Sequence, residues 1–448
     1  MKRYDVIVIG SGGGTKLVRP VAALGLKVAV VEKDRLGGTC LNRGCIPSKM
    51  LIHASDVATI VREAERFNVK AGEPVVDFEA LVKRVDEAID KDSDSIAPMY
   101  EKDPNIDLYH GHARFVEEGV IEVNKERIGG EKIFLAVGAR PSIPKIEGLE
   151  GTPYMTSTEA LREKKQPKKL LVIGGGYIAC ELGYFYGALG TEVHFIVRSK
   201  LLRNQDRDVQ AEFTKSFKKR FCVHEGCKPV KVSYDGTFTV ECESETLTGD
   251  ALLVAGGVVP NTDQLGLENT GIELEKGYIK VDKFLQTTSP GVWALGDCIG
   301  RYLFRHSVNF EGEYLFQTLF KGSKEPISYP PMPAAVFSHP QIGSVGLTED
   351  ACIEKCIDYV VGMNAYADSA MGMALRSEEG FVKLIFEKGS KKLIGAHIIG
   401  EEASNMIHML IYAMTFNATS DDLLKMIYIH PALPEVIRNA VRKVKYRG

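Results

Sequence analysis

Two cysteines in the segment GGTCLNRGCIPSK, residues 37–49, have the clearest potential for chemistry. Cys40 and Cys45 are separated by four residues, and a regular helix turns by about 100° per residue, so it would not place them on a common face. Gly44 allows the distorted turn that would bring them together, and Pro47 suits the first turn of a following helix. Cys45 would then lie at the positive end of the helix dipole, where a thiolate is stabilised.

Three kinds of chemistry are open to such a pair: a metal site, a structural disulfide and a redox-active dithiol. Zinc would need two further ligands, and no second close cysteine or histidine pair has metal-ligand spacing, so we predict no metal site. The nine cysteines are scattered and odd in number, which does not suit a disulfide framework. Two other close pairs, Cys222 with Cys227 and Cys352 with Cys356, lack a glycine-rich entry and a helix-starting proline. We expect most of the other cysteines to be small buried hydrophobic residues.

The segment YIHPALPE, near the end of the chain, holds a histidine in a defined setting. Pro431 favours an extended conformation at His430, and Pro434 suits the start of a helix, so the imidazole would lie in a fixed loop. Glu435 would be close enough to orient the ring. A lone histidine is commonly structural, but this pair, in a chain with a candidate redox dithiol, favours proton transfer at neutral pH.

The first residues predict a dinucleotide-binding unit. YDVIVIGSGGG predicts a strand and a glycine turn, and a helical stretch and the strand KVAVVE follow. Gly10 and Gly12 would let the backbone approach a pyrophosphate at a helix N-terminus, and Glu32 ends the second strand where a ribose hydroxyl would bind. The alternative is a glycine turn without a ligand, because Thr15 replaces a usual third glycine and Pro20 should kink or shorten the helix.

The same pattern recurs in KKLLVIGGGYIACELGYFYGALGTEVHFIVRSKLLR, with a glycine turn at Gly174 and Gly176 and with Ala179 at the close-packing position. Two such units make two bound dinucleotides the simplest explanation. The second strand of this unit ends without an acid, and three basic residues follow it: Arg198, Lys200 and Arg203. They suit a 2′-phosphate and favour NADPH over NADH, the alternative being that they are solvated surface charges.

Later segments complete an α/β organisation. IFLAVGARPSIP and LLVAGGVVPN each predict a strand that ends in glycine and proline, which places domain crossings near residues 150 and 262. In TTSPGVWALGDC a strand ends at Gly296 and Asp297, and an acid at this end of a strand could hold a ribityl or ribose hydroxyl. From about Pro330 the pattern changes to antiparallel strands and two late helices, which suits an association domain.

Composition narrows the class of protein. The chain has 448 residues, 44% of them hydrophobic, and a net charge of −3 without a basic stripe, so we expect neither nucleic acid nor membrane as partner. The apolar start is too short for a signal peptide, and no run of about 18 apolar residues is present. We expect a cytoplasmic globular protein of two to four domains.

Four motifs, in the order GGTCLNRGCIPSK, GGGYIACE, WALGDC and HPALPE, span the chain. With them the sequence resembles the flavin-dependent pyridine nucleotide disulfide oxidoreductases, the family of glutathione reductase, dihydrolipoamide dehydrogenase, mercuric reductase and mycothione reductase. The segments DPNIDLYHGHARF, PAAVFSHPQIGSVGLTE and IHPALPEVIRNAV are most similar to the mycothione reductase branch.

The resemblance implies an α/β fold with two Rossmann-like dinucleotide-binding domains, for FAD and NAD(P), and a C-terminal α+β dimerisation domain. The expected parts are an FAD-binding domain (1–150), an NAD(P)H-binding domain (151–262), a central part returning to the FAD domain (263–329) and an interface domain (330–448). FAD is expected around Gly10, Gly12, Gly14, Glu32, Gly38, Thr39, Gly138 and Asp297. NADPH is expected around Gly174, Gly176, Tyr177, Arg198, Lys200, Arg203 and Gly257.

The resemblance also implies a reaction: hydride passes from NADPH to the flavin, electrons pass to the cysteine pair, and the dithiol reduces a small disulfide through a mixed disulfide. Cys45 would face the flavin as the charge-transfer thiolate and Cys40 would be the interchange thiol. His430, oriented by Glu435, would come from the other subunit, so a homodimer would be obligatory. Two further roles are implied. Lys49 and Glu181 would flank the reactive flavin nitrogen, and Tyr177 would cover the nicotinamide pocket.

The leading hypothesis is an NADPH-dependent reductase of a low-molecular-weight thiol disulfide similar to mycothione. The main alternative is an NAD-dependent dihydrolipoamide dehydrogenase, although Arg198 stands where an NAD enzyme favours an acid. Mercuric reductase is disfavoured, because neither an N-terminal metal-binding domain nor a cysteine pair near Gly448 is present. A redox-sensing flavoprotein without turnover is also disfavoured, since the cysteine, histidine and glutamate motifs are intact.

Overall fold

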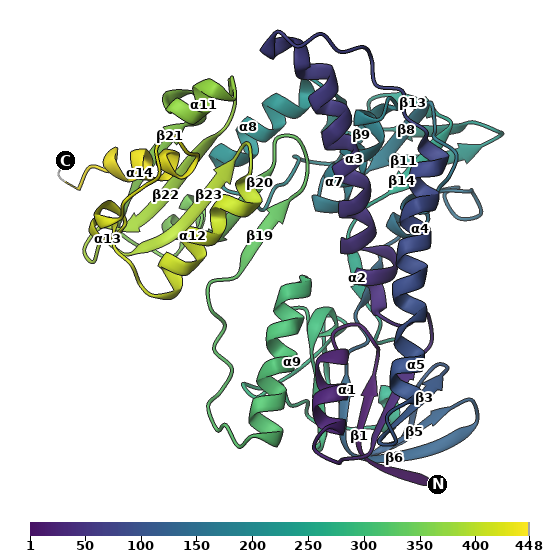
Figure 1. The fold of residues 1–448 in the computed structure, drawn as a ribbon. Helices are drawn as coiled ribbons and strands as arrows, with labels where there is room; N and C mark the ends of the chain where they lie inside the picture. The colour runs from purple at the N-terminus through teal and green to yellow at the C-terminus, as the bar shows by residue number, and fades with distance from the viewer. Residues whose placement is uncertain (447–448) are drawn as a thin grey trace.

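A seven-stranded sheet is the core of the first unit in the computed structural model, which describes residues 1–446 (Figure 1). Val6, Ile7 and Val8 of its central strand are fully buried, as expected for a strand covered on both faces. The strand order is β3 (Ile106–His110), β2 (Val28–Glu32), β1 (Lys2–Ile9), β6 (Glu126–Leu135), β5 (Val120–Val123), β4 (Arg114–Glu117), with β18 (Val292–Ala294) also on β6. Strands β1, β2, β3, β6 and β18 run parallel, and β4 and β5 are antiparallel.

The glycine turn after β1 leads into α1 (Thr15–Ala22). The Thr15 hydroxyl donates to the Gly12 carbonyl at 2.8 Å, so the residue that replaces the usual glycine ties the turn to the helix. The helix contains Pro20 and has only 8 residues, which confirms the predicted shortening. It packs beside α9 (Arg305–Phe320) at the sheet, as Figure 1 shows.

The second unit contains the repeated strand, glycine turn and helix. Its parallel sheet has the order β10 (Cys222–Glu225), β9 (Glu192–Val197), β8 (Lys169–Ile173), β14 (Ala251–Val254), and α7 (Tyr177–Ala188) follows β8. An antiparallel sheet of β11 (Pro229–Tyr234), β12 (Phe238–Cys242) and β13 (Thr246–Gly249) lies beside it. The two predicted crossing segments form β7 (Ala139–Pro141) and β15 (Val258–Pro260), which pair with each other. The exact domain boundaries stay predictions.

The third unit is an antiparallel sheet with helices, as the sequence predicts for the last part of the chain. Its strands are β19 (Pro333–Val336), β20 (Ile342–Gly346), β23 (Leu393–Ile399), β22 (Phe381–Glu387) and β21 (Tyr359–Ala365) in spatial order. Helix α12 (Ala403–Thr415) packs on β20 and β23, and α14 (Pro434–Arg442) packs on β21 and β22. Together the three units confirm the predicted α/β fold with an α+β segment at the end.

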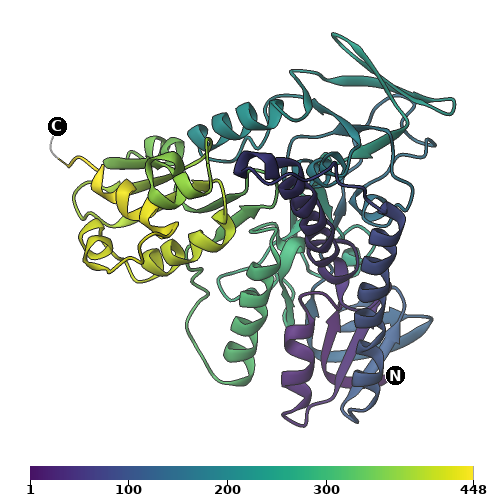
Figure 2. The same cartoon turned by 45° about the horizontal axis from the view of Figure 1, so that its top comes forward.

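Two helices run side by side from the first unit to the second, α3 (Cys45–Glu63) and α4 (Phe78–Asp94) (Figures 1 and 2). Helix α3 packs on α7 of the second unit, where the Ser55 hydroxyl donates to the Phe185 carbonyl at 3.1 Å. The hydroxyls of Thr59 and Tyr184 lie 3.1 Å apart at the same contact. The helix that begins at Cys45 is therefore fixed to the nucleotide-binding sheet.

A buried ion cluster joins the second and third units. Lys383 on β22 is fully buried, and its ammonium contacts Asp206 at 2.7 Å, Asp208 at 2.5 Å and also Glu349. Burial opposes its charge, but the hydrogen bonds to these carboxylates outweigh burial and raise the pKa of Lys383. The ammonium is therefore charged in the interior.

The remaining helices are shorter or lie nearer the surface. They are α2 (Gly38–Arg43), α5 (Ile96–Glu101), α6 (Ser157–Ala160), α8 (Arg207–Lys218), α10 (Glu349–Glu354), α11 (Ala370–Ala374) and α13 (Ser420–Lys425). Within residues 1–446 no helix is both long enough and apolar enough to cross a membrane.

Candidate redox-active site

Cys40 and Cys45 lie on two helices that meet at a sharp break. Cys40 is in α2, and Cys45 is the first residue of α3, with Gly44 between them. The backbone angles of Gly44, φ −148° and ψ −120°, are not helical, and a Cβ at this position would lie 2.9 Å from the Thr39 carbonyl oxygen. Both the predicted distortion at Gly44 and the predicted helix start are confirmed, with Pro47 in the first turn of α3.

The two thiols differ in acidity. A hydrogen bond between them raises the pKa of Cys40 above its ordinary value, with burial acting in the same direction. The same hydrogen bond lowers the pKa of Cys45 to about 6, and the positive charge of Lys49 contributes to this shift. Both cysteines are free thiols, with Cys40 half-buried and Cys45 exposed. Cys45 is therefore the thiolate near neutral pH, and Cys40 holds the proton.

Lys49 forms an ion pair one helical turn after Cys45. Its Nζ lies 2.6 Å from Oε2 of Glu181, which is buried in α7. The other oxygen of Glu181 accepts from the backbone N–H of Phe337 at 3.0 Å, and the Lys49 ammonium lies 4.4 Å from the centre of that ring. The structure thus brings together four residues predicted from the sequence: Cys40, Cys45, Lys49 and Glu181.

Helix α2, which carries Cys40, is held in place by Asn42. Its side-chain amide donates to the backbone carbonyls of Leu36 at 2.8 Å and Gly38 at 3.1 Å, and the backbone carbonyl of Asn42 accepts from Arg162 at 3.3 Å. Because these bonds link both ends of α2 to its surroundings, they restrict movement of the Cys40 sulfur. Neither Asn42 nor Arg162 was predicted as a site residue.

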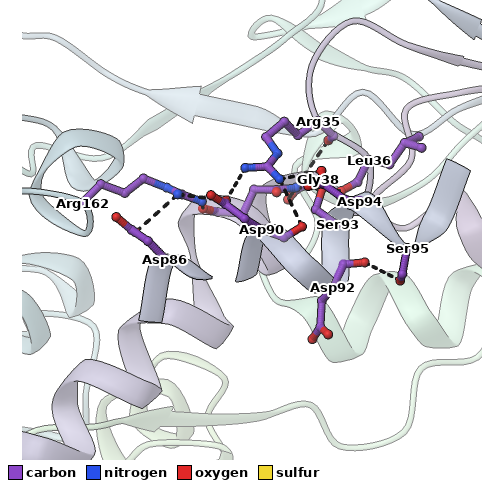
Figure 3. Close-up of polar contacts among 11 residues, drawn as sticks. Arg35, Leu36, Gly38, Asp86, Asp90, Asp92, Ser93, Asp94, Ser95 and Arg162 are labelled. Carbon is purple, nitrogen blue, oxygen red and sulfur yellow. Dashed lines mark hydrogen bonds and ion pairs between the residues drawn. The ribbon is translucent and has the colours of Figure 1, made fainter. Parts of the chain in front are cut away.

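Figure 3 shows the acidic face of α4, which packs beside α2. Arg35 donates to Asp90 and, at 2.7 Å, to Asp94. Arg162 contacts Asp90 at 3.0 Å and Asp86 at 3.3 Å. The three carboxylates recur at every fourth residue, so helical spacing alone indicates a common face. The sequence gives no comparable indication of the two arginines that they contact.

The first glycine turn has features that fit FAD. A Cβ on Gly38 would lie 2.5 Å from the Cα of Gly12, so two backbones meet closely at the turn. Glu32 is buried and accepts from the Ser11 N–H at 2.9 Å and from the Ser11 hydroxyl at 2.8 Å. Asp297 has no hydrogen-bond or ion-pair partner for its carboxylate among residues 1–446, and burial raises its pKa to about 6. An unpaired, largely buried acceptor of this kind suits the hydroxyl groups of a ribityl chain.

The second glycine turn has features that fit a phosphorylated nucleotide. A Cβ on Gly174 would lie 2.3 Å from the Ala255 carbonyl oxygen, whereas the space beside Gly176 is open. Tyr177 begins α7 directly after this turn. The three basic residues after β9 are exposed, and none pairs with a carboxylate in the described part of the chain: Arg198, Lys200 and Arg203.

His430 and Glu435 lie apart from the cysteine pair. Nδ1 of His430 is 3.0 Å from Oε2 of Glu435, and the side chain of His430 is 70% exposed. Helices α13 and α14, which flank His430, lie on the far side of the third unit from α2 in both views (Figures 1 and 2). The predicted contact between the two residues is confirmed, and one chain does not bring His430 to Cys40.

One expectation about the other cysteines needs correction. Cys227 and Cys242 form a disulfide that joins the start of β11 to the end of β12. From the sequence we expect Cys227 to be a small buried hydrophobic residue and its spacing to Cys222 to carry no chemistry; Cys222 is a free, exposed thiol. The pairing follows the antiparallel register, which places β11 beside β12. Of the remaining free cysteines, Cys180, Cys298 and Cys352 are buried, as expected.

Comparisons with known proteins agree with this geometry. The mycothione reductase of Mycobacterium tuberculosis (strain ATCC 25618 / H37Rv) is 36% identical over 459 residues, which cover 98% of this chain and 99% of the relative. The dihydrolipoyl dehydrogenase of Chlorobaculum tepidum is 35% identical, over 98% of this chain and 96% of the relative. The structure of the HOCl-induced flavoprotein disulfide reductase RclA from Escherichia coli superposes with a TM-score of 0.90 at 28% identity and covers 99% of this chain and all of that one.

Two family descriptions match the sequence itself. Residues 4–312 match the pyridine nucleotide-disulphide oxidoreductases, and residues 332–441 match the dimerisation domain of the same family. Together they cover both glycine turns, the cysteine pair and the antiparallel third unit. The chain therefore belongs to the pyridine nucleotide-disulphide oxidoreductase family, as an FAD-dependent enzyme that exchanges electrons between a pyridine nucleotide and a disulfide.

Proposed function

We propose that this protein is an NADPH-dependent reductase of a low-molecular-weight thiol disulfide, of the mycothione type. The observation that carries the proposal is the placement of the two thiols on either side of the break at Gly44, with Cys45 at the N-terminus of α3 and the Lys49–Glu181 ion pair one turn further on. This setting lowers the pKa of Cys45 and raises that of Cys40. A thiolate and a protonated thiol in contact suit dithiol–disulfide exchange. Similarity to mycothione reductase and the three unpaired basic residues after β9 favour the substrate class and NADPH.

Two sets of residues would hold the cofactors. The glycine turn at Gly10 and Gly12, the carboxylate of Asp297, and Glu32 would bind FAD, and the turn at Gly174 with the basic residues would bind NADPH. Bound FAD would supply the redox chemistry between the nicotinamide and the cysteine pair, which is the acceptance of a hydride and the transfer of the electron pair. The Lys49 and Glu181 pair would lie beside the reactive part of the ring.

The cysteine residues would perform the exchange in two steps. First, the Cys40 thiol loses its proton to a base, its sulfur attacks one sulfur of the substrate, and a mixed disulfide forms as one thiolate leaves. Second, the Cys45 thiolate attacks the Cys40 sulfur, so the protein disulfide closes and the second thiolate leaves. The dithiol is oxidised by two electrons, and the substrate becomes two thiols once both leaving groups are protonated.

The base would come from a second copy of the chain. Cys40 needs help to ionise because its pKa is raised, and helices α13 and α14, which flank His430 of its own chain, lie on the far side of the third unit from α2. In a homodimer, which the dimerisation domain supports, His430 of the partner subunit would accept the Cys40 proton and return it to the leaving thiolate. Glu435 would fix the ring, with Nδ1 bonded and Nε2 free.

A second function is favoured by one observation: the dihydrolipoyl dehydrogenase of Chlorobaculum tepidum is almost as similar as the mycothione reductase. That enzyme class would run the same dithiol chemistry with dihydrolipoamide and NAD. The difference lies in the nucleotide and in the disulfide, not in the cysteine pair.

One experiment separates the two functions. The FAD-loaded dimer is assayed with NADPH and with NADH against mycothione, oxidised glutathione, bis-γ-glutamylcystine, coenzyme A disulfide and lipoamide. Fast NADPH-dependent turnover of one thiol disulfide is expected, whereas NADH turnover with lipoamide alone would replace the proposal by the second function. Cys40→Ser should abolish disulfide reduction and keep NADPH oxidation by an artificial acceptor. Cys356→Ser, which changes an exposed free thiol elsewhere, is the matched control and should keep both.

A further inference from the structure

Gln205 connects the predicted nicotinamide site to the third unit. Its side chain is buried, and Nε2 donates to the hydroxyl of Tyr177 at 2.5 Å. Oε1 of the same amide accepts from the hydroxyl of Ser344 on β20 at 2.8 Å. A single side chain thus forms a hydrogen-bonded path from α7 of the second unit to the central sheet of the third.

The backbone around Gln205 is held in place. Its N–H donates to the Leu202 carbonyl at 2.9 Å, and the next residue, Asp206, is fully buried. Asp206 accepts from the ammonium of Lys383 at 2.7 Å and from the Glu349 N–H at 3.2 Å, both in the third unit. Because the loop is anchored on this side, Gln205 cannot follow the Tyr177 hydroxyl when that ring moves.

Tyr177 also contacts the first unit. The centre of its ring lies 6.2 Å from that of Phe304, just before α9, with 32° between the two planes. Tyr177 is one helical turn before Glu181, the partner of Lys49, and directly follows the second glycine turn. The ring therefore lies where all three units meet, beside the ion pair predicted to flank the flavin.

We propose that Gln205 is a positioning residue that holds Tyr177 over the nicotinamide pocket and, through Ser344, couples this ring to the dimerisation domain. The inference rests on the proposed function and on the role that the family resemblance implies for Tyr177, a ring over the nicotinamide pocket that the nucleotide would have to displace. The Gln205 bond opposes that displacement, so losing it favours the open ring and tightens nucleotide binding. A net hydrogen bond of ordinary strength corresponds to about a threefold to tenfold change in the dissociation constant.

The test measures nucleotide binding rather than turnover. NADP⁺ is titrated into the FAD-loaded dimer, without disulfide, and followed by flavin fluorescence. Tyr177→Phe, which keeps the ring, and Gln205→Met, which keeps the volume, should each lower the dissociation constant by about threefold to tenfold. The double variant should match either single variant, because both changes remove the same bond. Gln205→Glu should not tighten binding of NADP⁺. Its carboxylate can accept hydrogen bonds from the hydroxyls of both Tyr177 and Ser344, so the ring stays held.

Two further variants define the coupling. Ser344→Ala removes the hydrogen bond to Oε1 of Gln205 and should lower the dissociation constant for NADP⁺ by a smaller factor than Gln205→Met does. An unchanged dissociation constant would mean that the dimerisation domain does not influence Tyr177. Gln210→Met, which removes a side-chain bond to Thr214 within α8, is the matched control and should change nothing. An unchanged or higher dissociation constant for a folded Gln205→Met would overturn the role of Gln205. Failure of the proposed function is distinct, because NADPH would then not reduce the flavin of the wild-type protein.

Discussion

Nδ1 of His430 lies 3.0 Å from a carboxylate oxygen of Glu435, and this contact leaves Nε2 of the exposed ring free. Burial opposes ionisation of Glu435, but hydrogen bonds from the Ala432 N–H and from His430 outweigh it and hold the pKa of the carboxyl below its ordinary value. Arg438 adds a contact at 2.8 Å. The ionised carboxylate fixes the Nδ1–H tautomer, which is the form that accepts a proton at Nε2.

His430→Gln is expected to lower kcat for disulfide reduction by about 10²–10⁴-fold, because the raised pKa of Cys40 demands a base. Glu435→Gln should cause a smaller loss and shift the pH–rate profile, since an amide no longer favours one tautomer. Steady-state rates from pH 5 to 9 with the disulfide and with an artificial acceptor check both variants, and the acceptor rate should stay unchanged. His408→Gln, an exposed histidine on α12, is the control. Equal losses with the acceptor would contradict a role confined to the dithiol.

The thiolate of Cys45 should titrate near pH 6. Alkylation by iodoacetamide, followed by mass spectrometry of the Cys45 peptide, should rise through this pH and be nearly constant above pH 8. Because the folded pKa is below the ordinary thiol value, the thiolate stabilises the fold at high pH, and this contribution is lost as the pH falls through about 6.

Lys49→Met should move the alkylation profile of Cys45 to higher pH, since the ammonium is one cause of the low pKa. Lys83→Met removes an exposed lysine paired with Glu87 on α4 and should leave the profile in place. If Lys49→Met left the midpoint unchanged, the hydrogen bond from Cys40 alone would explain the acidity.

Asp297→Asn should have opposite effects on stability and on cofactor affinity. The pKa of Asp297 is raised to about 6, so its folding penalty is absent below the ordinary carboxyl pKa and complete above pH 6. Without FAD, the amide should stabilise the protein at pH 8 by an amount on the order of 3 kcal/mol and by less at pH 5. The dissociation constant for FAD should rise. Thermal unfolding and FAD titration measure the two effects, with exposed Asp235→Asn as control.

Lys383→Met should weaken the joint between the second and third units. Its removal leaves the fully buried carboxylate of Asp206 without a cation, whereas Glu349 keeps its ion pair with Arg207, and we expect a cost of about 3–5 kcal/mol in the free energy of unfolding. Urea denaturation measures this cost. Lys391→Met, which breaks an exposed pair with Asp421, should cost at most about 1 kcal/mol. A similar small loss for both variants would mean that the buried cluster contributes little.

The basic residues after β9 should determine nucleotide preference. Replacing Arg198 and Arg203 by alanine should reduce the ratio of kcat/KM for NADPH over NADH by at least about tenfold, because charge-assisted bonds to a 2′-phosphate are lost. Rates with NADH should change little. Lys228→Ala, an exposed lysine paired with Glu243 in the same unit, should leave the ratio unchanged. If the kcat/KM ratio of NADPH over NADH were unchanged in the variant, Arg198 and Arg203 would be solvated surface charges that do not select the nucleotide.

Local patterns in the sequence predicted what local physics determines. Gly44, Pro47 and Pro434 gave the helix breaks and starts, because glycine and proline restrict the backbone wherever they occur. Contacts between distant segments were not predictable in this way. The hydrogen bond between Ser344 and Gln205 joins residues that are 139 positions apart in the sequence. The disulfide of Cys227 with Cys242 depends on the pairing of β11 with β12. Such contacts depend on how the units pack, and no spacing in one segment records that packing.

The separation of His430 from Cys40 within one chain has a genetic consequence. A chain with Cys40→Ser and a chain with His430→Gln would each be inactive alone. In the proposed dimer each site takes Cys40 from one subunit and His430 from the other. If both chains are made in one cell, each mixed dimer would then contain one site with both changes and one site with neither. Equal amounts that pair at random would give about one quarter of wild-type activity, so two null alleles would complement each other.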